Sequence, residues 1–181
     1  MFYLALACRC MAGVVFAAAA ISKVRNVTAY RAFAAWLAGL EVLPAPVRRP
    51  AAPVLIAVEV AVTVTVALPP TAPAGLLLAA VTLAIFAVGA AVMIGRDSTE
   101  SCQCFGASST PLGPPHVIRN ALGCALAVGG AVFAADAGHP AIHPFPVILS
   151  AGCGLVLALL LIFTDDIAAL FTAPLSKEAR P

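Results

Sequence analysis

Long apolar stretches separated by short polar breaks dominate the chain. A helix needs about 20 predominantly apolar residues to cross a bilayer, and five stretches approach or exceed that length: 2–22, 51–68, 74–95, 117–137 and 145–164. Charged residues lie well inside only two of them, Arg9 in the first and Glu59 in the second. The pattern predicts an all-α integral membrane bundle with four core transmembrane helices and a fifth, in a single domain over 1–172.

The connector between the first two stretches is too apolar for a plain loop. Apolar side chains recur there with helical spacing, at Tyr30, Phe33, Ala34, Leu37 and Leu40. With Thr28 as N-cap and Trp36 at the interface, this predicts a short amphipathic helix that lies on the membrane. Four prolines then end this helix and return the chain to the bilayer: Pro44, Pro46, Pro50 and Pro53.

Composition supports a membrane protein and excludes several other classes. Hydrophobic residues make up 62% of the 181, charged residues only 10%, and the mean hydropathy is +1.06, whereas a soluble domain has about 25% charged residues. A net charge of +2 gives no basic surface for nucleic acid. The six cysteines do not define a redox compartment, because at least half lie in apolar stretches where cysteine behaves as a small hydrophobe.

The largest polar break, residues 97–115, carries Cys102 and Cys104. Cysteines at i and i+2 can bridge in a bent loop, with strain that makes the bond exchangeable, so a redox pair is favoured. A metal site with His116 as third ligand is an alternative, although structural zinc takes four ligands. The third reading is a structural turn or docking surface without turnover. The tail, 173–181, is expected to be flexible.

Ionisable groups inside a membrane are costly unless they are paired or functional. Glu59 has two candidate partners, Arg9 and Lys23, and their pairing either fixes helix packing or serves quinone binding or proton movement. Counted along the predicted spans, Cys10 and Cys153 lie at a similar depth in the bilayer, which permits a thiol relay across it. Packing is nevertheless the favoured role of both residues. His139 and His143 are expected at the surface.

Basic residues gather on one side if all five stretches cross. Nine of the ten face that side with the 97–115 loop: Lys23, Arg25, Arg31, Arg48, Arg49, Arg96, Arg119, Lys177 and Arg180. The positive-inside rule then places the loop in the cytoplasm. An oxidase for exported proteins would instead expose its thiols outside, so the sidedness of the loop is an open question.

Four sequence features together resemble the methylamine utilisation MauE family, within the DoxX-like membrane proteins. They are AlaAlaIleSerLysVal at 19–24, the central Glu59, CysXCysPheGly at 102–106 and ArgAsnAla starting at Arg119 and Asn120. The resemblance covers about 9–130 and implies a multi-pass protein of the bacterial inner membrane. It further implies maturation of the disulfide-rich small subunit of methylamine dehydrogenase, a thioredoxin-like partner, and a bundle similar to vitamin K epoxide reductase.

Two functions are therefore carried forward. In the first, Cys102 and Cys104 are the catalytic pair of a thiol-disulfide oxidoreductase or electron conduit that acts on an exported, disulfide-containing protein; Arg9, Lys23, Glu59, Arg119, Asn120, Cys10 and Cys153 are the supporting candidates. In the second, the protein is a non-catalytic maturation factor that holds a thioredoxin-like partner at the membrane. No cofactor is assigned, and a quinone is left open as an electron acceptor.

Overall fold

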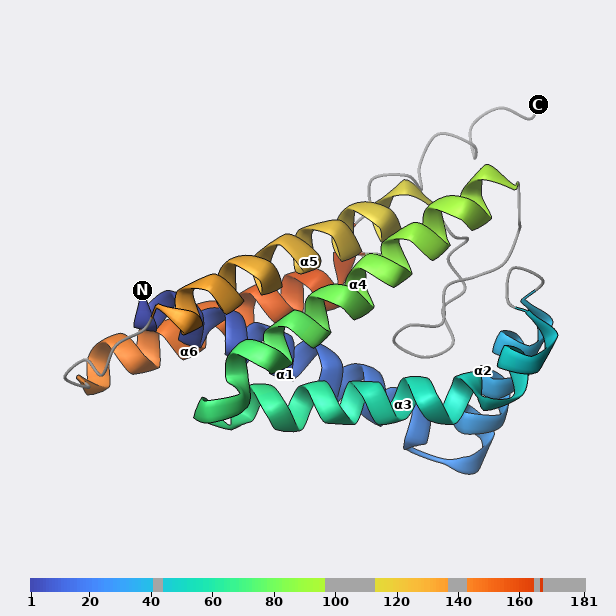
Figure 1. The fold of residues 1–181 in the computed structure, drawn as a ribbon, viewed down its shortest axis with the longest axis horizontal. Helices are drawn as coiled ribbons and strands as arrows, with labels where there is room; N and C mark the ends of the chain where they lie inside the picture. Colours follow the sequence, from blue (N-terminus) through green and yellow to red (C-terminus); the bar gives the residue numbers. More distant parts are fainter. Residues whose placement is uncertain (41–43, 97–112, 137–142, 165–166, 168–181) are drawn as a thin grey trace, which may run out of the picture.

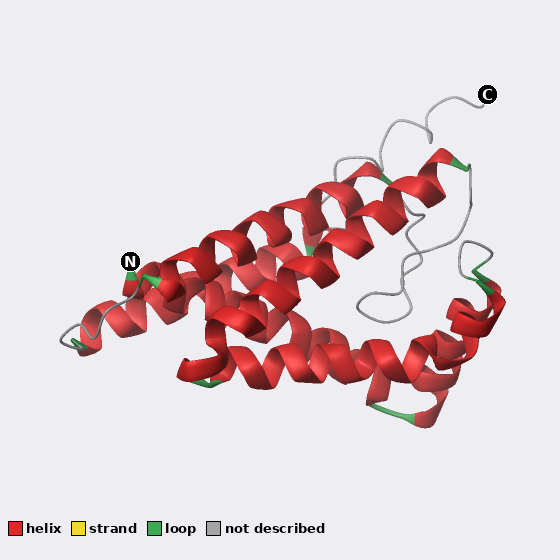
Figure 2. Cartoon of the chain, viewed as in Figure 1, coloured by secondary structure: helices red, strands yellow, loops and turns green. Residues whose placement is uncertain are grey.

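A computed structural model describes residues 1–40, 44–96, 113–136, 143–164 and 167. The helices are α1 (Phe2–Val24), α2 (Val27–Gly39), α3 (Ala45–Ala67), the 3₁₀ turn η1 (Pro69–Thr71), α4 (Ala72–Gly95), α5 (Pro114–Ala135) and α6 (Pro144–Ile162). All regular structure in this described part is helical (Figure 2), and within it five helices, α1, α3, α4, α5 and α6, are long and apolar enough to cross a membrane. The prediction of an all-α membrane bundle is confirmed.

Helix α1 lies at the centre of the bundle. It packs against α3, α5 and α6, while α4 packs along α5 and joins α3 through η1 (Figure 1). The end of α1, all of α2, the start of α3, the end of α4 and the start of α5 lie at one end of the molecule, which we call the α2 end. The N-terminus, η1 and the start of α6 lie at the opposite end.

Small residues allow the helices around α1 to approach closely. Ser150, Gly154 and Ala158 recur every four residues on α6 and are buried. A Cβ added at Gly154 would overlap the carbonyl oxygen of Ala7 and lie 2.7 Å from Cβ of Cys10. Because lipid tails are as apolar as leucine, helix association in a membrane depends on such close packing. The fifth span is therefore an integral part of the bundle.

Helix α2 is present between the first two spans, but its N-terminus differs from the expected one. The side chain of Asn26, not Thr28, caps the helix and accepts a hydrogen bond from the backbone N–H of Ala29 at 2.7 Å. Asn26 has the extended backbone that an N-cap requires, whereas Thr28 already lies inside the helix. Phe33 and Leu37 face the bundle and belong to an apolar cluster that includes residues of α3 and α4.

The prolines after α2 do not act as expected. Helix α3 begins at Ala45, six residues before the expected start of the second span at 51, and Pro50 and Pro53 lie inside it, so these two prolines do not end α2 as predicted. Pro46 stands in the first turn, where the N–H has no acceptor within the helix. Pro50 and Pro53 have no backbone N–H, so each leaves one carbonyl of the preceding turn without its usual donor. A membrane helix tolerates this loss when neighbouring groups donate a hydrogen bond to that carbonyl.

Candidate functional site

The predicted cysteine pair lies in 97–112, outside the described residues. The helices on either side of that segment are described. Arg96 caps the end of α4 and is exposed, and Gly113 precedes α5. Since α4 and α5 pack along each other, both attachment points of the segment lie at the α2 end (Figure 1).

The first turns of α5 hold three buried polar side chains. His116 and Gly113 form two hydrogen bonds: the N–H of His116 donates to the carbonyl oxygen of Gly113 at 3.0 Å, and the N–H of Gly113 donates to Nδ1 of His116 at 3.2 Å. Nδ2 of Asn120 donates to the carbonyl oxygen of His116 at 2.9 Å. His116 therefore fixes the start of α5 with one of its ring nitrogens.

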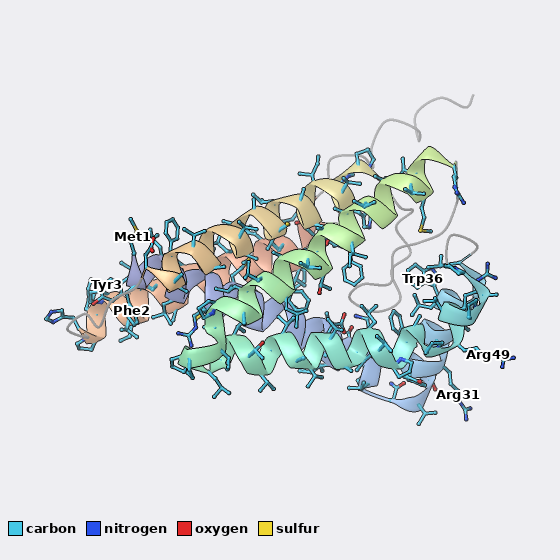
Figure 3. All side chains as sticks on the ribbon, viewed as in Figure 1. Met1, Phe2, Tyr3, Arg31, Trp36 and Arg49 are labelled. Carbon is cyan, nitrogen blue, oxygen red and sulfur yellow. The ribbon has the colours of Figure 1, made fainter. Side chains whose placement is uncertain are left out.

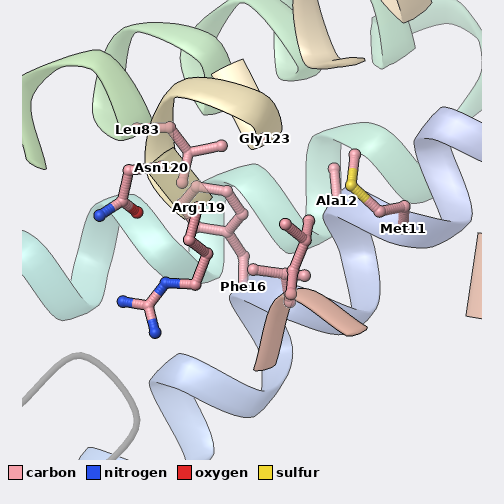
Figure 4. A pocket seen from close by; sticks show the side chains of 9 residues that line it. Met11, Ala12, Phe16, Leu83, Arg119, Asn120 and Gly123 are labelled. Atoms are coloured by element: carbon pink, nitrogen blue, oxygen red, sulfur yellow. The ribbon is translucent and has the colours of Figure 1, made fainter. Parts of the chain in front are cut away.

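A small cavity lies beside Arg119 and Asn120, which are 4% and 5% exposed. Its volume is about 20 Å³, and residues of α1, α4, α5 and α6 line it; Met11, Phe16 and Leu83 supply apolar walls (Figure 4). A cavity of this size holds about one water molecule, far less than the 300 Å³ or more of a usual ligand pocket. This cavity therefore has no room for a quinone ring.

An ion pair joins α1 to α3 near the α2 end. Nζ of Lys23 donates to Oε1 of Glu59 at 2.7 Å, and the two side chains are only 2% and 1% exposed. Lys23 also donates to the carbonyl oxygen of Ala19 at 3.1 Å, and its Nζ lies 5.1 Å from the ring centroid of Phe33 on α2. Among the described residues, Oε2 of Glu59 has no hydrogen-bond partner. Of the two candidate partners of Glu59, the structure pairs it with Lys23.

Arg9 instead binds the far end of α3. Its Nε donates to the carbonyl oxygen of Val66 at 2.9 Å, and its Nη2 donates to that of Ala67 at 3.0 Å. These carbonyls lie in the last turn of α3 and lack helical donors, and a cation there also complements the helix dipole. Arg9 is a capping residue of α3 and does not contact Glu59 directly.

The described cysteines Cys8, Cys10, Cys124 and Cys153 are all free thiols. Cys10 lies at the close contact between α1 and α6, where Gly154 is its neighbour. Cys153 is exposed on α6. The structure thus brings the helices of Cys10 and Cys153 together without a disulfide between these residues; packing stays the predicted role of both, and the relay stays the alternative.

No group of three or more potential metal ligands occurs among the described residues. His143 is exposed, as predicted for a surface residue, and His139 lies outside the described residues. Two site features were missed from the sequence, the placement of Phe33 over the Lys23 ammonium and the capping role of His116. A histidine three residues after a glycine at a helix start was an available signal for the second; no sequence signal indicated the first.

These features define a multi-pass helical membrane protein with buried charges near the end that carries the cysteine segment. The family model of methylamine utilisation protein MauE matches residues 1–133, which is most of the chain. The chain belongs to the MauE family. Helix α6 lies beyond the matched residues. No curated protein and no solved structure matches the chain.

Proposed function

We propose that the protein is a membrane thiol-disulfide oxidoreductase that uses Cys102 and Cys104 to assist the maturation of an exported protein. The observation that carries the proposal is the CysXCys pair in the segment between α4 and α5 of a MauE-family chain. Membership of the MauE family supports a role in methylamine utilisation, and the proposal adopts it together with a location in the bacterial inner membrane and a thioredoxin-like immediate partner.

The exchange moves two electrons through the pair without a bound cofactor. A thiolate of the exported protein attacks the Cys102–Cys104 disulfide at Cys102, and a mixed disulfide forms as the Cys104 thiolate leaves. A second thiolate of the exported protein then releases reduced Cys102 and closes the new disulfide. The Cys102 thiolate next attacks the disulfide of an oxidised thioredoxin-like protein, and Cys104 resolves that intermediate, which regenerates the pair and leaves the partner as a dithiol.

Charged residues on both sides of the cysteines act on this chemistry in opposite directions. Arg96 ends α4 and Arg119 lies in the first turns of α5, whereas Asp97 and Glu100 stand between Arg96 and Cys102 in the sequence. The arginines favour a thiolate and the two carboxylates oppose it. A thiolate is both the attacking species and the leaving species of each exchange, and neighbouring cations stabilise it.

The experiment is to trap the mixed disulfide. In Cys104→Ser the resolving thiol is absent, so Cys102 should remain joined to its partner by a mixed disulfide, which a reductant cleaves. Cys124→Ser, which removes a free thiol of α5 that belongs neither to the pair nor to the Cys10 and Cys153 relay, is the control and should leave partner maturation unchanged. Cys102→Ser with Cys104→Ser should trap nothing and abolish maturation of the partner. Full partner maturation in that double variant would overturn the proposal and leave the non-catalytic maturation factor as the function.

A further inference from the structure

Four arginines surround α2 at its end of the bundle: Arg25 after α1, Arg31 on α2, and Arg48 and Arg49 near the start of α3. We call them the basic platform. Arg25, Arg31 and Arg49 are exposed and Arg48 is half-buried. Figure 3 shows Arg31 and Arg49 projecting away from the bundle at the same end as Trp36. The platform is thus a cationic surface beside the sole tryptophan of the chain.

The described residues of these helices offer Arg25, Arg31 and Arg49 little compensating negative charge. Helix α2 contains no acidic residue, and the one acidic residue of α3, Glu59, is buried and paired with Lys23. Between Arg25 and Arg49 the sequence has a single further acidic residue, Glu41, which lies outside the described residues. The segment therefore carries an excess of positive charge that its own carboxylates do not balance.

The position of α2 places this charge where the chain leaves the apolar part of the bundle. Helix α2 connects the end of the first span to the start of the second, and its inner face is fixed by Phe33 and Leu37. Phe33 stacks with Trp36 at a centroid distance of 6.2 Å and also contacts the Lys23 ammonium. Arg31 therefore stands on a helix that is anchored to the spans, and the other three arginines lie at the ends of the two spans that α2 connects.

We propose that the basic platform binds the headgroups of anionic phospholipids. Arginines next to a membrane span attract anionic lipid, and their side chains donate several hydrogen bonds to phosphate oxygens. Trp36 is half-buried against the cluster of Phe33 and Leu37, with its indole nitrogen buried, so it marks the position of α2 and the arginines supply the headgroup contacts. This assignment is independent of the redox role of Cys102 and Cys104, so the two can fail separately.

Trp36 supplies a site-specific probe, because its fluorescence reports α2 alone. The full chain is reconstituted in phosphatidylcholine vesicles containing brominated phosphatidylglycerol, and in phosphatidylglycerol vesicles containing brominated phosphatidylcholine at the same mole fraction. Bromine quenches a nearby indole, so the ratio of the two quenching efficiencies measures headgroup preference beside α2. The brominated anionic lipid should quench more strongly, and the excess should fall in high salt, which shortens the screening length to about 3 Å at 1 M.

Charge-matched double variants test the platform itself. Arg31→Gln with Arg49→Gln removes two exposed charges, and the headgroup preference should fall by about fivefold for each arginine. Lys177→Gln with Arg180→Gln removes the same charge from the C-terminal segment and should leave the preference unchanged. Equal quenching by both brominated lipids in the unmodified chain would overturn the proposal, and so would an equal loss in the two double variants. Equal quenching by both brominated lipids would instead indicate that the platform binds an acidic protein partner.

Discussion

The buried Lys23–Glu59 pair predicts an asymmetric response to mutation. At 2.7 Å the two charges attract by about 6 kcal/mol at an effective dielectric constant of 20, and desolvation of both groups offsets much of that attraction. Removing one partner of a buried pair costs about 3–5 kcal/mol, because the remaining charge stays buried without compensation. The two single variants remove different sets of contacts and should not be equivalent.

Lys23→Met should be the more destabilising single variant. Among the described residues Glu59 has only Lys23 as a side-chain hydrogen-bond partner, so the variant leaves a carboxylate at 1% exposure with no donor. In Glu59→Gln the lysine keeps the carbonyl oxygen of Ala19 and the ring of Phe33, and the amide oxygen can still accept. We expect a loss of about 3–5 kcal/mol for Lys23→Met and about 1–3 kcal/mol for Glu59→Gln.

The assay is thermal unfolding of the full chain in detergent, followed by circular dichroism and by Trp36 fluorescence. For a chain of this size 1 kcal/mol shifts the midpoint by about 2–4 °C, so Lys23→Met should lower it by about 6–20 °C. Lys23→Met combined with Glu59→Leu replaces the pair with apolar side chains and should recover most of the loss. A double variant as unstable as Lys23→Met, or a Glu59→Gln variant less stable than Lys23→Met, would refute this account.

Two further contacts predict measurable changes in the same unfolding assay. Gly154→Ala should destabilise the bundle by about 1–3 kcal/mol, because the added Cβ overlaps the backbone oxygen of Ala7, whereas Gly152→Ala, with nothing within 4 Å of its Cβ, should be neutral or slightly stabilising. Arg9→Gln should lose about 1.5–3 kcal/mol by removing a charged donor from the last carbonyls of α3; Arg9→Lys should retain part of that stability, and equal losses in both would contradict the capping role.

The apolar spans could be predicted from the sequence because hydrophobic length is a local property. The start of α3 could not, since a proline ends a helix or lies within it depending on whether nearby groups satisfy the freed carbonyl. Pro50 and Pro53 look the same in sequence as Pro44, which does precede the helix. Their position in α3 is a consequence of packing.

The partner of Arg9 was within reach of sequence reasoning. At about 1.5 Å per residue, the end of α3 lies roughly 12 Å beyond Glu59 and level with Arg9. The Pro69–Pro70 pair ends the helix there and leaves backbone carbonyls without donors. Considering only side chains as partners led to Glu59, whereas the structure gives Arg9 two backbone acceptors. The cysteine pair, by contrast, was found by motif and lies in 97–112, outside the described residues.

The structure sharpens the question of sidedness, because it separates the basic residues by burial. Lys23 is neutralised by Glu59 and Arg119 is buried, so neither is an exposed charge at the surface. Arg25, Arg31, Arg49 and Arg96 remain exposed at the α2 end, and by the positive-inside rule they favour a cytoplasmic location for that end and for both attachment points of the cysteine segment. A cytoplasmic pair could reach exported proteins only through a relay across the bilayer, and Cys153 is exposed on α6 while Cys10 faces Gly154. The test is labelling of Cys102 and Cys104 by an impermeant maleimide in intact, reduced cells. Labelling would place the pair outside, where it can exchange disulfides with exported proteins directly. Protection until lysis would refute direct exchange and leave the Cys10 and Cys153 relay as the one remaining route to exported proteins.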